Sequence, residues 1–386
     1  MTQELLTANH AAATAAVMAG RANRTARGFG SGVYPITPQS ESIELLSQLD
    51  IEKGTVVRVE SEHSAMAVCI GCSMAGARSY TASSSNGLAY MVENVYAAAL
   101  ARLPIVMMAV NRTLGPPWNI WADHGDTLML RDTGWLQLYC EDNQEVFDSI
   151  VAAFRLAEDR RIMLPVMVNL DAFVLSHTLM QIDLPDQQTV DAFLPTLDLP
   201  HRLSDKPRVI GQLDLPHDAE VHRQQMADAM ARVPEVYGEV QDAFEASFGR
   251  RLADPVVPYR MEDAEVVLVS MGTIASTARE AVDVARSRGI RAGALRVRMF
   301  RPLPVALFGK LLGDAKRVAI VDRDISPGLG GVLWSELSAA AGSRALVQGY
   351  MMGLGGGDIR PSHLEGLIDD IMGREGAGEP SIVEVS

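Results

Sequence analysis

Two carboxylates and a histidine, Glu60, Glu62 and His63, lie together between two different kinds of sequence. The apolar residues 56–59 before them predict a strand, and the alanine- and glycine-rich segment after them, which reaches Gly76, predicts a closely packed helix. A carboxylate at such a turn is expected to be half buried beside a helix N-terminus, where it can hold or deliver one proton at a fixed point. The alternative is that Glu60 and Glu62 only favour the positive end of that helix.

Arg112 is a second candidate, because it comes directly after the continuous apolar run 104–110. A guanidinium at the carboxyl end of a strand is well placed to bind a carboxylate through two hydrogen bonds. The alternative is a surface arginine that is paired with Asp123 or Asp126.

Two further loops carry residues that could shape a site. Thr37 could offer its hydroxyl to a substrate oxygen, but with Pro38 it also predicts the start of a helix, in which Thr37 is the N-cap and its oxygen is already engaged. Trp118 and Trp121, two of the four tryptophans, fall in the loop after Arg112. Tryptophans in a loop indicate a pocket wall or an interface anchor.

The cysteines and histidines give little support for a metal site. Cys69 and Cys72 have C-x-x-C spacing without a second pair, and we expect them to be small buried apolar residues in the helix after Glu62. Three cysteines are also too few for an iron–sulfur cluster held by this chain alone, which needs about four thiolates. His63 and His124 are expected to be hydrogen-bonded structural residues, so no metal ligand is predicted.

Two glycine-rich loops invite a nicotinamide-binding interpretation, which would make the chain an NAD-linked dehydrogenase. Residues 328–331 follow a predicted strand and open a helix, but Leu333 stands where the third glycine of the fingerprint belongs. The run 353–357 is followed by Asp358 at the corresponding place. Tight turns and close packing against another subunit explain these glycines better.

Composition limits the class of protein. A chain of 386 residues is expected to form two domains, and 48% hydrophobic content excludes a disordered chain. The net charge of −14 argues against nucleic acid or an anionic membrane as the main partner. No segment is long and apolar enough to span a bilayer, and residues 1–10 lack the basic region of a signal peptide, so we expect a cytoplasmic protein.

The elements that would position these residues alternate between apolar strands and helices, which predicts an α/β fold with a parallel sheet covered on both faces. In such sheets ligands bind at the carboxyl ends of the strands. The predicted strands are residues 32–36, 56–59, 78–82, 104–110 and 165–170, and the predicted helices are 9–30, 38–49, 62–76, 88–102 and 151–158.

The pattern changes over residues 176–259, which are polar and contain prolines. We interpret this region as an arm that wraps a neighbouring surface, with a helix over 218–248 that is kinked or divided at Pro234. A second α/β unit begins at Asp263. Its predicted strands are 265–271, 292–298, 317–322 and 346–351, and its last helix is 361–372.

Several motifs in order resemble the alpha subunit of 2-oxoacid:ferredoxin oxidoreductases, most of all the pyruvate enzymes. They are Tyr-Pro-Ile-Thr-Pro-Gln-Ser at 34–40, Glu-Ser-Glu-His-Ser-Ala at 60–65, Asn-Arg at 111–112, Trp-Ala-Asp-His at 121–124 and Arg-Asp-Thr-Gly-Trp at 131–135. The resemblance implies that residues 1–250, with a connecting arm at about 176–258, form a pyrimidine-type thiamine diphosphate-binding domain. It implies that residues 260–386 form a smaller α/β domain like the C-terminal domain of transketolase.

The resemblance also implies a reaction, in which a 2-oxoacid, pyruvate before others, is decarboxylated to acyl-CoA and carbon dioxide while electrons pass through iron–sulfur clusters to ferredoxin or a similar acceptor. The family's catalytic glutamate, which bonds to the aminopyrimidine of the cofactor, falls on Glu62. Its substrate-binding arginine and threonine fall on Arg112 and Thr37. Tyr34 and Pro35, together with Glu62, would contact the cofactor.

Partner subunits follow from the same resemblance. The sequence has no Gly-Asp-Gly run followed by Asn, the family signature for the Mg²⁺–diphosphate end of the cofactor. A beta subunit would therefore supply the diphosphate and Mg²⁺ site and a [4Fe-4S] cluster, with gamma and ferredoxin-like delta subunits, and coenzyme A as cosubstrate.

One departure from the family concerns the substrate. Residues 114–118, Leu-Gly-Pro-Pro-Trp, replace a Ser-Ala-Pro-type run found in many pyruvate enzymes. Oxalate, phenylglyoxylate, 2-oxoisovalerate and 2-oxoglutarate therefore stay open as substrates, and a non-catalytic scaffold subunit stays open as another function.

Overall fold

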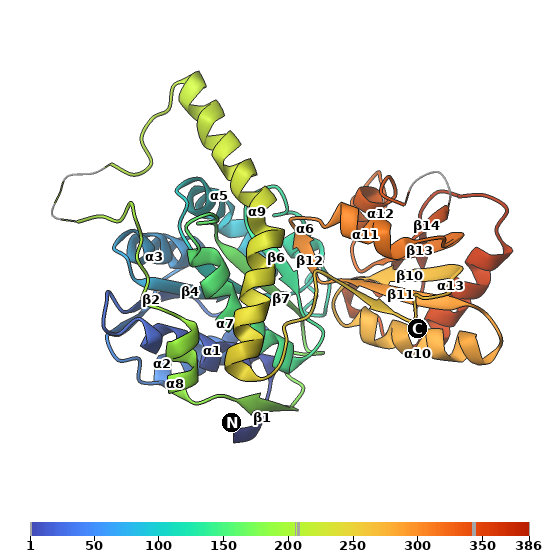
Figure 1. The fold of residues 1–386 in the computed structure, drawn as a ribbon, viewed down its shortest axis with the longest axis horizontal. Helices are drawn as coiled ribbons and strands as arrows, with labels where there is room; N and C mark the ends of the chain where they lie inside the picture. The colour runs from blue at the N-terminus through green and yellow to red at the C-terminus, as the bar shows by residue number, and fades with distance from the viewer. Residues whose placement is uncertain (1, 205, 207–208, 342–344, 386) are drawn as a thin grey trace.

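The computed structural model describes residues 2–204, 206, 209–341 and 345–385. Over these residues the chain forms two α/β units that lie side by side in Figure 1, the first coloured from blue to green and the second from orange to red. The prediction of parallel sheets in two units is confirmed, although the connections between the units differ from those expected.

The strands form two large sheets and one small one. They are β1 (Thr2–Leu6), β2 (Phe29–Val33), β3 (Gly54–Arg58), β4 (Arg78–Ser83), β5 (Ile105–Asn111), β6 (Leu136–Tyr139), β7 (Val166–Asp171), β8 (Met180–Leu184), β9 (Val256–Tyr259), β10 (Val266–Ser270), β11 (Ala292–Val297), β12 (Met299–Arg301), β13 (Arg317–Asp322), β14 (Leu346–Met352) and β15 (Ser381–Val383). The first unit has the order β12-β6-β7-β5-β4-β2-β3, the second has β15-β14-β13-β10-β11-β9, and β1 pairs with β8. Only β12 in the first sheet and β9 in the second run antiparallel to their neighbours among the described strands.

The helices cover both faces of each large sheet. They are α1 (Ala8–Ala22), α2 (Ser40–Gln48), α3 (Glu62–Met74), α4 (Ser85–Tyr90), α5 (Val92–Leu100), α6 (Gly125–Leu128), α7 (Asn143–Glu158), α8 (Gln187–Phe193), α9 (Pro216–Phe248), α10 (Ile274–Ser287), α11 (Val305–Leu312), α12 (Val332–Leu337) and α13 (Pro361–Gly373), with a short 3₁₀ helix, η1 (Leu354–Gly356).

Strand β5 shows how the sheet is buried on both faces. Val106 and Val110 pack into the core beneath α1 and α7, whereas Ile105 and Met107 pack into the core beneath α3 and α5. Alternate side chains of a strand point to opposite faces, so an apolar run without polar interruptions is needed here. This explains why the residues that could do chemistry are confined to the ends of the strands.

Several helix boundaries differ from the prediction. Helix α1 stops at Ala22 instead of residue 30, because the Asn23 side chain binds the Gly28 carbonyl at 2.8 Å and closes a turn. The helix predicted from residue 151 already begins at Asn143, with Asp142 as its N-cap. The predicted helix 88–102 is two helices, α4 and α5, and strand β6 was not predicted.

Helix α9 runs along the first unit, and its N-terminal part extends beyond the body of that unit (Figure 1). The helix is continuous through Pro234, so the predicted division at this residue is wrong. Val233, Val236 and Val240 are buried against the first unit, and this packing holds the helix together across the proline. Three residues of the predicted arm, 205, 207 and 208, lie outside the described residues.

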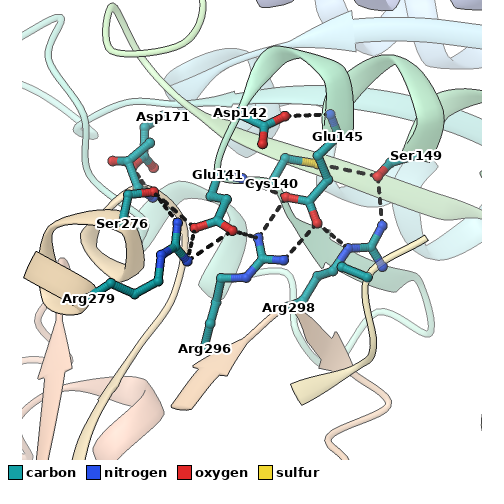
Figure 2. Close-up of polar contacts among 12 residues, drawn as sticks. Cys140, Glu141, Asp142, Glu145, Ser149, Asp171, Ser276, Arg279, Arg296 and Arg298 are labelled. Atoms are coloured by element: carbon teal, nitrogen blue, oxygen red, sulfur yellow. Dashed lines mark hydrogen bonds and ion pairs between the residues drawn. The ribbon is translucent and has the colours of Figure 1, made fainter. Parts of the chain in front are cut away.

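The two units are joined by a strand and by buried charges. Strand β12 follows β11 of the second unit but pairs with β6 of the first. Beside it Glu145 lies between Arg298, with Nε 2.6 Å from Oε1, and Arg296, with Nη1 2.7 Å from Oε2 (Figure 2). Glu141 binds Arg279 of α10 at 2.9 Å in the same network. The charges on the two units thus neutralise one another where water is excluded.

Candidate active site

Glu62 is the first residue of α3, directly after Ser61, whose hydroxyl caps the helix by accepting from the Ser64 backbone. Only 8% of Glu62 is exposed, and burial raises the pKa of its carboxyl group. Glu60 lies two residues away but is exposed, and a hydrogen bond from Ser64 lowers the pKa of its carboxyl. Two neighbouring glutamates therefore differ in proton affinity because one is desolvated and the other is not.

A glycine lies directly beside the Glu62 carboxyl group. A Cβ added at Gly87 of α4 would stand 2.7 Å from Glu62 Oε1 and 2.5 Å from Ser83 Oγ. Ser83 ends β4, and its buried hydroxyl has no hydrogen-bond partner among the described residues. The Gly87 backbone thus packs directly against the Glu62 carboxyl group at the end of β4, beside one unsatisfied hydroxyl, which is unusual for buried polar groups.

Arg112 follows β5, and its guanidinium is held by two backbone carbonyls. Nη1 donates to Thr37 at 2.7 Å, and Nε donates to Asn119 at 3.1 Å. The guanidinium makes no ion pair with a described carboxylate, and burial lowers its pKa, an effect that the nearby Asp126 carboxyl only partly offsets. Trp118, which is 69% exposed, lies with its ring centroid 6.0 Å from the guanidinium carbon. A buried cation without an acidic partner is ready to bind an anion.

Asp126 explains why the alternative interpretation of Arg112 is wrong. Its Oδ2 accepts from the backbone N–H of Arg112 at 3.0 Å and of Ser85 at 2.9 Å, and Oδ1 accepts from Asn111 at 2.9 Å. The carboxyl thus binds the backbone of Arg112 and not its guanidinium. Burial raises the pKa of Asp126 to about 7 despite these hydrogen bonds. Only the general polarity of this loop could have indicated this role from the sequence.

Thr37 does not cap a helix, so this part of the prediction is wrong. Helix α2 begins at Ser40 with Gln39 in the cap position, and the amide of Gln39 donates to the Tyr34 carbonyl at 2.9 Å. This hydrogen bond closes a loop after β2 that contains both Thr37 and Pro38. Thr37 is exposed, and its hydroxyl makes no hydrogen bond with the described residues.

Tyr34 and Pro35 occupy the same loop after β2. Tyr34 is half-buried and Pro35 is exposed. Strand β2 lies between β3 and β4, which lead to Glu62 and Ser83. The chain moves from β2 to β3 on one side and then to β4 on the other, and ligands bind at such reversals of strand order in open α/β sheets. The structure therefore brings the predicted site residues to the carboxyl ends of neighbouring strands in the sheet.

His124 and Asp171 form a second polar cluster between the units. His124 Nε2 lies 2.7 Å from Asp171 Oδ1, and Asp171 Oδ2 accepts from the Thr273 backbone at 3.1 Å and from Arg323 at 3.5 Å. Burial disfavours the charge of Asp171, but His124 and Arg323 outweigh it and lower the pKa of this carboxyl. The prediction that His124 is a hydrogen-bonded structural residue is confirmed.

A cavity of about 550 Å³ lies between the two units, away from Glu62 and Arg112. Trp121 and Phe173 of the first unit and Thr273, Arg323 and Gly356 of the second are among its lining residues. Its volume falls within the range of small-molecule sites.

The remaining predictions on cysteines can be checked directly. Cys69 is fully buried, and burial raises the pKa of its thiol to about 12, as expected for a small apolar residue. Cys72 is only half-buried, so the prediction that both cysteines are buried is wrong for Cys72. Within the described residues no group of three or more His, Cys, Asp and Glu side chains could hold a metal ion, and no helix could cross a membrane.

Comparison with known proteins decides the family. Residues 28–242 match the model described as "Pyruvate flavodoxin/ferredoxin oxidoreductase, thiamine diP-bdg", and residues 264–364 match "Pyruvate:ferredoxin oxidoreductase core domain II". The chain belongs to this family. Residues 28–242 are accordingly its thiamine diphosphate-binding domain.

Relatives with about 40% identity are subunits of 2-oxoacid oxidoreductases. The chain is 41% identical to pyruvate synthase subunit PorA of Methanothermobacter thermautotrophicus, over 95% of each chain. It is 42% identical to PorA of Thermotoga maritima, over 87% of this chain and 88% of the relative. It is 40% identical to ketoisovalerate oxidoreductase subunit VorA of Pyrococcus abyssi, over 88% of this chain and 87% of the relative.

Solved structures show the same fold at low sequence identity. A 2-oxoglutarate:ferredoxin oxidoreductase from Magnetococcus marinus, with 2-oxoglutarate, coenzyme A and succinyl-CoA bound, matches 96% of this chain with a TM-score of 0.74 and 19% identity. The present chain spans 65% of that longer chain. A split-gene transketolase in an inactive tetramer matches 95% of this chain and 98% of its own, with a TM-score of 0.59 and 13% identity.

Proposed function

We propose that this chain is the alpha-type subunit of an enzyme that oxidatively decarboxylates pyruvate to acetyl-CoA and carbon dioxide, and passes the electrons through iron–sulfur clusters to ferredoxin or a similar acceptor. The observation that carries this proposal is that the buried Glu62 carboxyl and the Arg112 guanidinium, which makes no ion pair with a described carboxylate, both lie at the carboxyl ends of strands of one sheet. The relatives named pyruvate synthase support it.

The Glu62 end of this edge fits the aminopyrimidine of thiamine diphosphate. Gly87 lets the backbone of α4 lie directly against the carboxyl group, and the Ser83 hydroxyl there has no hydrogen-bond partner among the described residues and could bind a polar atom of the ring. In this proposal Glu62 bonds to a ring nitrogen, while Tyr34 and Pro35 contact the cofactor from the loop after β2. The bound cofactor supplies the nucleophilic carbon and the electron sink for decarboxylation.

Glu62 is the proposed catalytic residue because its environment favours proton exchange. Burial raises its pKa, so its carboxyl group takes up a proton more readily at neutral pH than the exposed Glu60 does. The N-terminus of α3 favours the ionised form, which keeps the group able to release the proton again.

Arg112 and Thr37 are the proposed substrate-binding residues. The guanidinium would hold the carboxylate of the 2-oxoacid, and the Thr37 hydroxyl, which makes no hydrogen bond with described residues, would donate to a substrate oxygen. The hydrogen bond between Arg112 and the Thr37 carbonyl keeps the two groups together, which would fix the orientation of the bound 2-oxoacid.

We propose that residues 1–250 and 260–386 act as two domains within a larger assembly. The relatives are named as subunits, which supports partner chains. In this proposal a beta subunit supplies the diphosphate and Mg²⁺ site and a [4Fe-4S] cluster, because three cysteines are too few to hold such a cluster. Gamma and delta subunits, with coenzyme A as cosubstrate, complete the assembly.

A branched 2-oxoacid is the second candidate substrate. Identity to the VorA relative, at 40%, is close to the 41% and 42% of the PorA relatives, so identity does not separate pyruvate from 2-oxoisovalerate. The exposed Trp118 near Arg112 belongs to the loop that departs from many pyruvate enzymes, and its ring could pack against a larger substrate side chain.

The test is an assay of the chain purified with its native partners. CoA-dependent reduction of a viologen dye is measured with pyruvate, 2-oxoisovalerate, 2-oxoglutarate, oxalate and phenylglyoxylate. We expect the highest kcat/KM with pyruvate. A highest value with another of these acids assigns that substrate instead, and no CoA-dependent reduction with any of them contradicts the proposed activity. The chain alone is expected to show no turnover.

A further inference from the structure

We infer that Asn119 and the loop 353–357 of the second unit are positioning elements for Arg112, so that the second unit sets the affinity for the substrate carboxylate. This inference rests on the proposed role of Arg112 in substrate binding and deepens it.

Asn119 contacts both the guanidinium and the second unit. Its backbone carbonyl accepts from Arg112 Nε at 3.1 Å, and its side-chain Nδ2 donates to the Gly355 carbonyl at 3.0 Å. Its Oδ1 accepts from the Trp121 backbone at 2.7 Å. Asn119 therefore supplies one of the two carbonyls that orient Arg112. The Gly355 carbonyl of the second unit in turn holds the Asn119 side chain.

Gly356, in the loop 353–357 of the second unit, packs its backbone directly against Trp121. A Cβ at this position would stand 2.1 Å from the Trp121 Cβ, and its φ of +88° is in the region that favours glycine. The Trp121 carbonyl accepts from the Thr113 backbone at 3.1 Å, next to Arg112. Any displacement of Trp121 by the second unit is therefore passed to the residue that follows Arg112.

The loop that carries Asn119 lies at the surface between contacts with both units. Trp118 is 69% exposed and Trp121 is 49% exposed, and Trp121 borders the cavity between the units. The first unit holds the near part of the loop, where Asn86 exchanges hydrogen bonds with Gly115 at 2.9 and 3.2 Å. The far part, which includes Asn119, is held on one side by Thr113 and Phe173 of the first unit and on the other by Gly355 and Gly356 of the second.

Substitution of Gly356 tests the contact from the side of the second unit. In Gly356→Ala the added Cβ displaces Trp121, and we expect the KM for the 2-oxoacid to rise by about tenfold with a smaller change in kcat and none in the KM for CoA. Gly289→Ala is the matched control, because Gly289 has a φ of +85° and a Cβ there meets nothing within 4 Å. Equal KM values in the two variants would overturn the inference.

A second variant avoids reliance on one substitution in a strained turn. Asn119→Ala in the complete enzyme should raise the KM for the 2-oxoacid, and in Asn119→Ala/Arg112→Gln the two effects should be less than additive. Additive effects, or a KM unchanged by Asn119→Ala, contradict the positioning role while leaving the proposed function intact. If Arg112→Gln itself leaves the KM unchanged, the proposed substrate-binding role of Arg112 fails first.

Discussion

Arg112 Nη1 lies 2.7 Å from the Thr37 carbonyl, and this hydrogen bond joins the ends of β5 and β2, two strands that are separated in the sheet by β4. This hydrogen bond therefore spans the end of β4, the strand that ends at Ser83 and leads to Gly87 beside Glu62. The residues that follow four neighbouring strands, β5, β4, β2 and β3, thus lie at the same end of the sheet, although they come from distant parts of the sequence.

Replacement of the buried glutamate should abolish turnover. In Glu62→Gln the side chain keeps its size but cannot exchange a proton, so we expect kcat to fall by about 10²–10⁴-fold. Co-purification of the partner subunits should be unchanged. Glu60→Gln is the control, since Glu60 is exposed and should retain nearly full activity. A scaffold subunit would instead lose no activity with either substitution.

The same substitution should stabilise the protein at neutral pH. The folded state raises the pKa of Glu62, so the folded chain binds this proton more tightly than the unfolded chain, and stability decreases as the pH rises above the unfolded pKa of about 4.3. Glu62→Gln removes this cost and should be more stable by about 0.5–2 kcal/mol at pH 7. The difference should vanish near pH 3, about one unit below the unfolded pKa, where the carboxyl is protonated in both states. Thermal unfolding of the assembled enzyme at both pH values measures it, and an unchanged difference contradicts the assignment.

Gly87, which packs against the Glu62 carboxyl group, should not tolerate a side chain. In Gly87→Ala the new Cβ would stand 2.7 Å from Glu62 Oε1, so we expect about a tenfold or greater loss of kcat and a weaker apparent affinity for thiamine diphosphate. Gly71→Ala is the matched control, because Gly71 also lies in a helix and its Cβ meets nothing within 4 Å. Gly71→Ala should be neutral or slightly stabilising. Normal activity of Gly87→Ala would show that close packing of Gly87 against Glu62 is not needed for catalysis.

Glu145 is expected to make the largest ion-pair contribution to the free energy that holds the two units together. Burial disfavours its charge, but Arg298 and Arg296 outweigh this and lower its pKa to about 2. The stabilisation is therefore present above the unfolded pKa of about 4.3 and is lost as the pH falls toward about 2. Glu145→Gln leaves the buried Arg298 guanidinium without a carboxylate partner, while Arg296 keeps Glu141 at 3.3 Å, and it should cost about 3–5 kcal/mol in urea unfolding at pH 7.

The control for this prediction is an exposed ion pair. Arg251 binds Asp242 at 2.8 Å at the surface, where water screens the charges, so Arg251→Gln should change the unfolding free energy far less than Glu145→Gln does. If Glu145→Gln costs no more than Arg251→Gln, the buried network contributes little to stability.

The parts of the fold that the sequence predicted are those with a strong local pattern. The apolar run of β5 and the strand-to-helix turn at Glu62 were predicted because burial on both faces of a parallel sheet demands such composition. Helix α7 was predicted too short, since its first half carries polar residues whose partners lie elsewhere in the chain, as Glu145 pairs with Arg298.

The candidate site was predicted only in part, for a similar reason. Glu62 and Arg112 could be found because they interrupt or follow apolar runs. Gly87 and Ser83 could not be assigned, because their importance comes from a close approach to Glu62 across the sheet edge. Asn119 carried no local signal at all, since its partner Gly355 lies more than two hundred residues away.

Strand β12 limits how the two units can be separated. The chain leaves the first unit after α9, builds β9 to β11, and returns through β12 to the edge of the first sheet before it completes the second unit. A protease that cuts between α9 and β9 would thus release no independent halves, because the C-terminal fragment keeps a strand in the N-terminal sheet. Relative motion of the units is restricted in the same way to a rotation about this shared strand, so opening the interface widely would require unpairing β12 from β6 first.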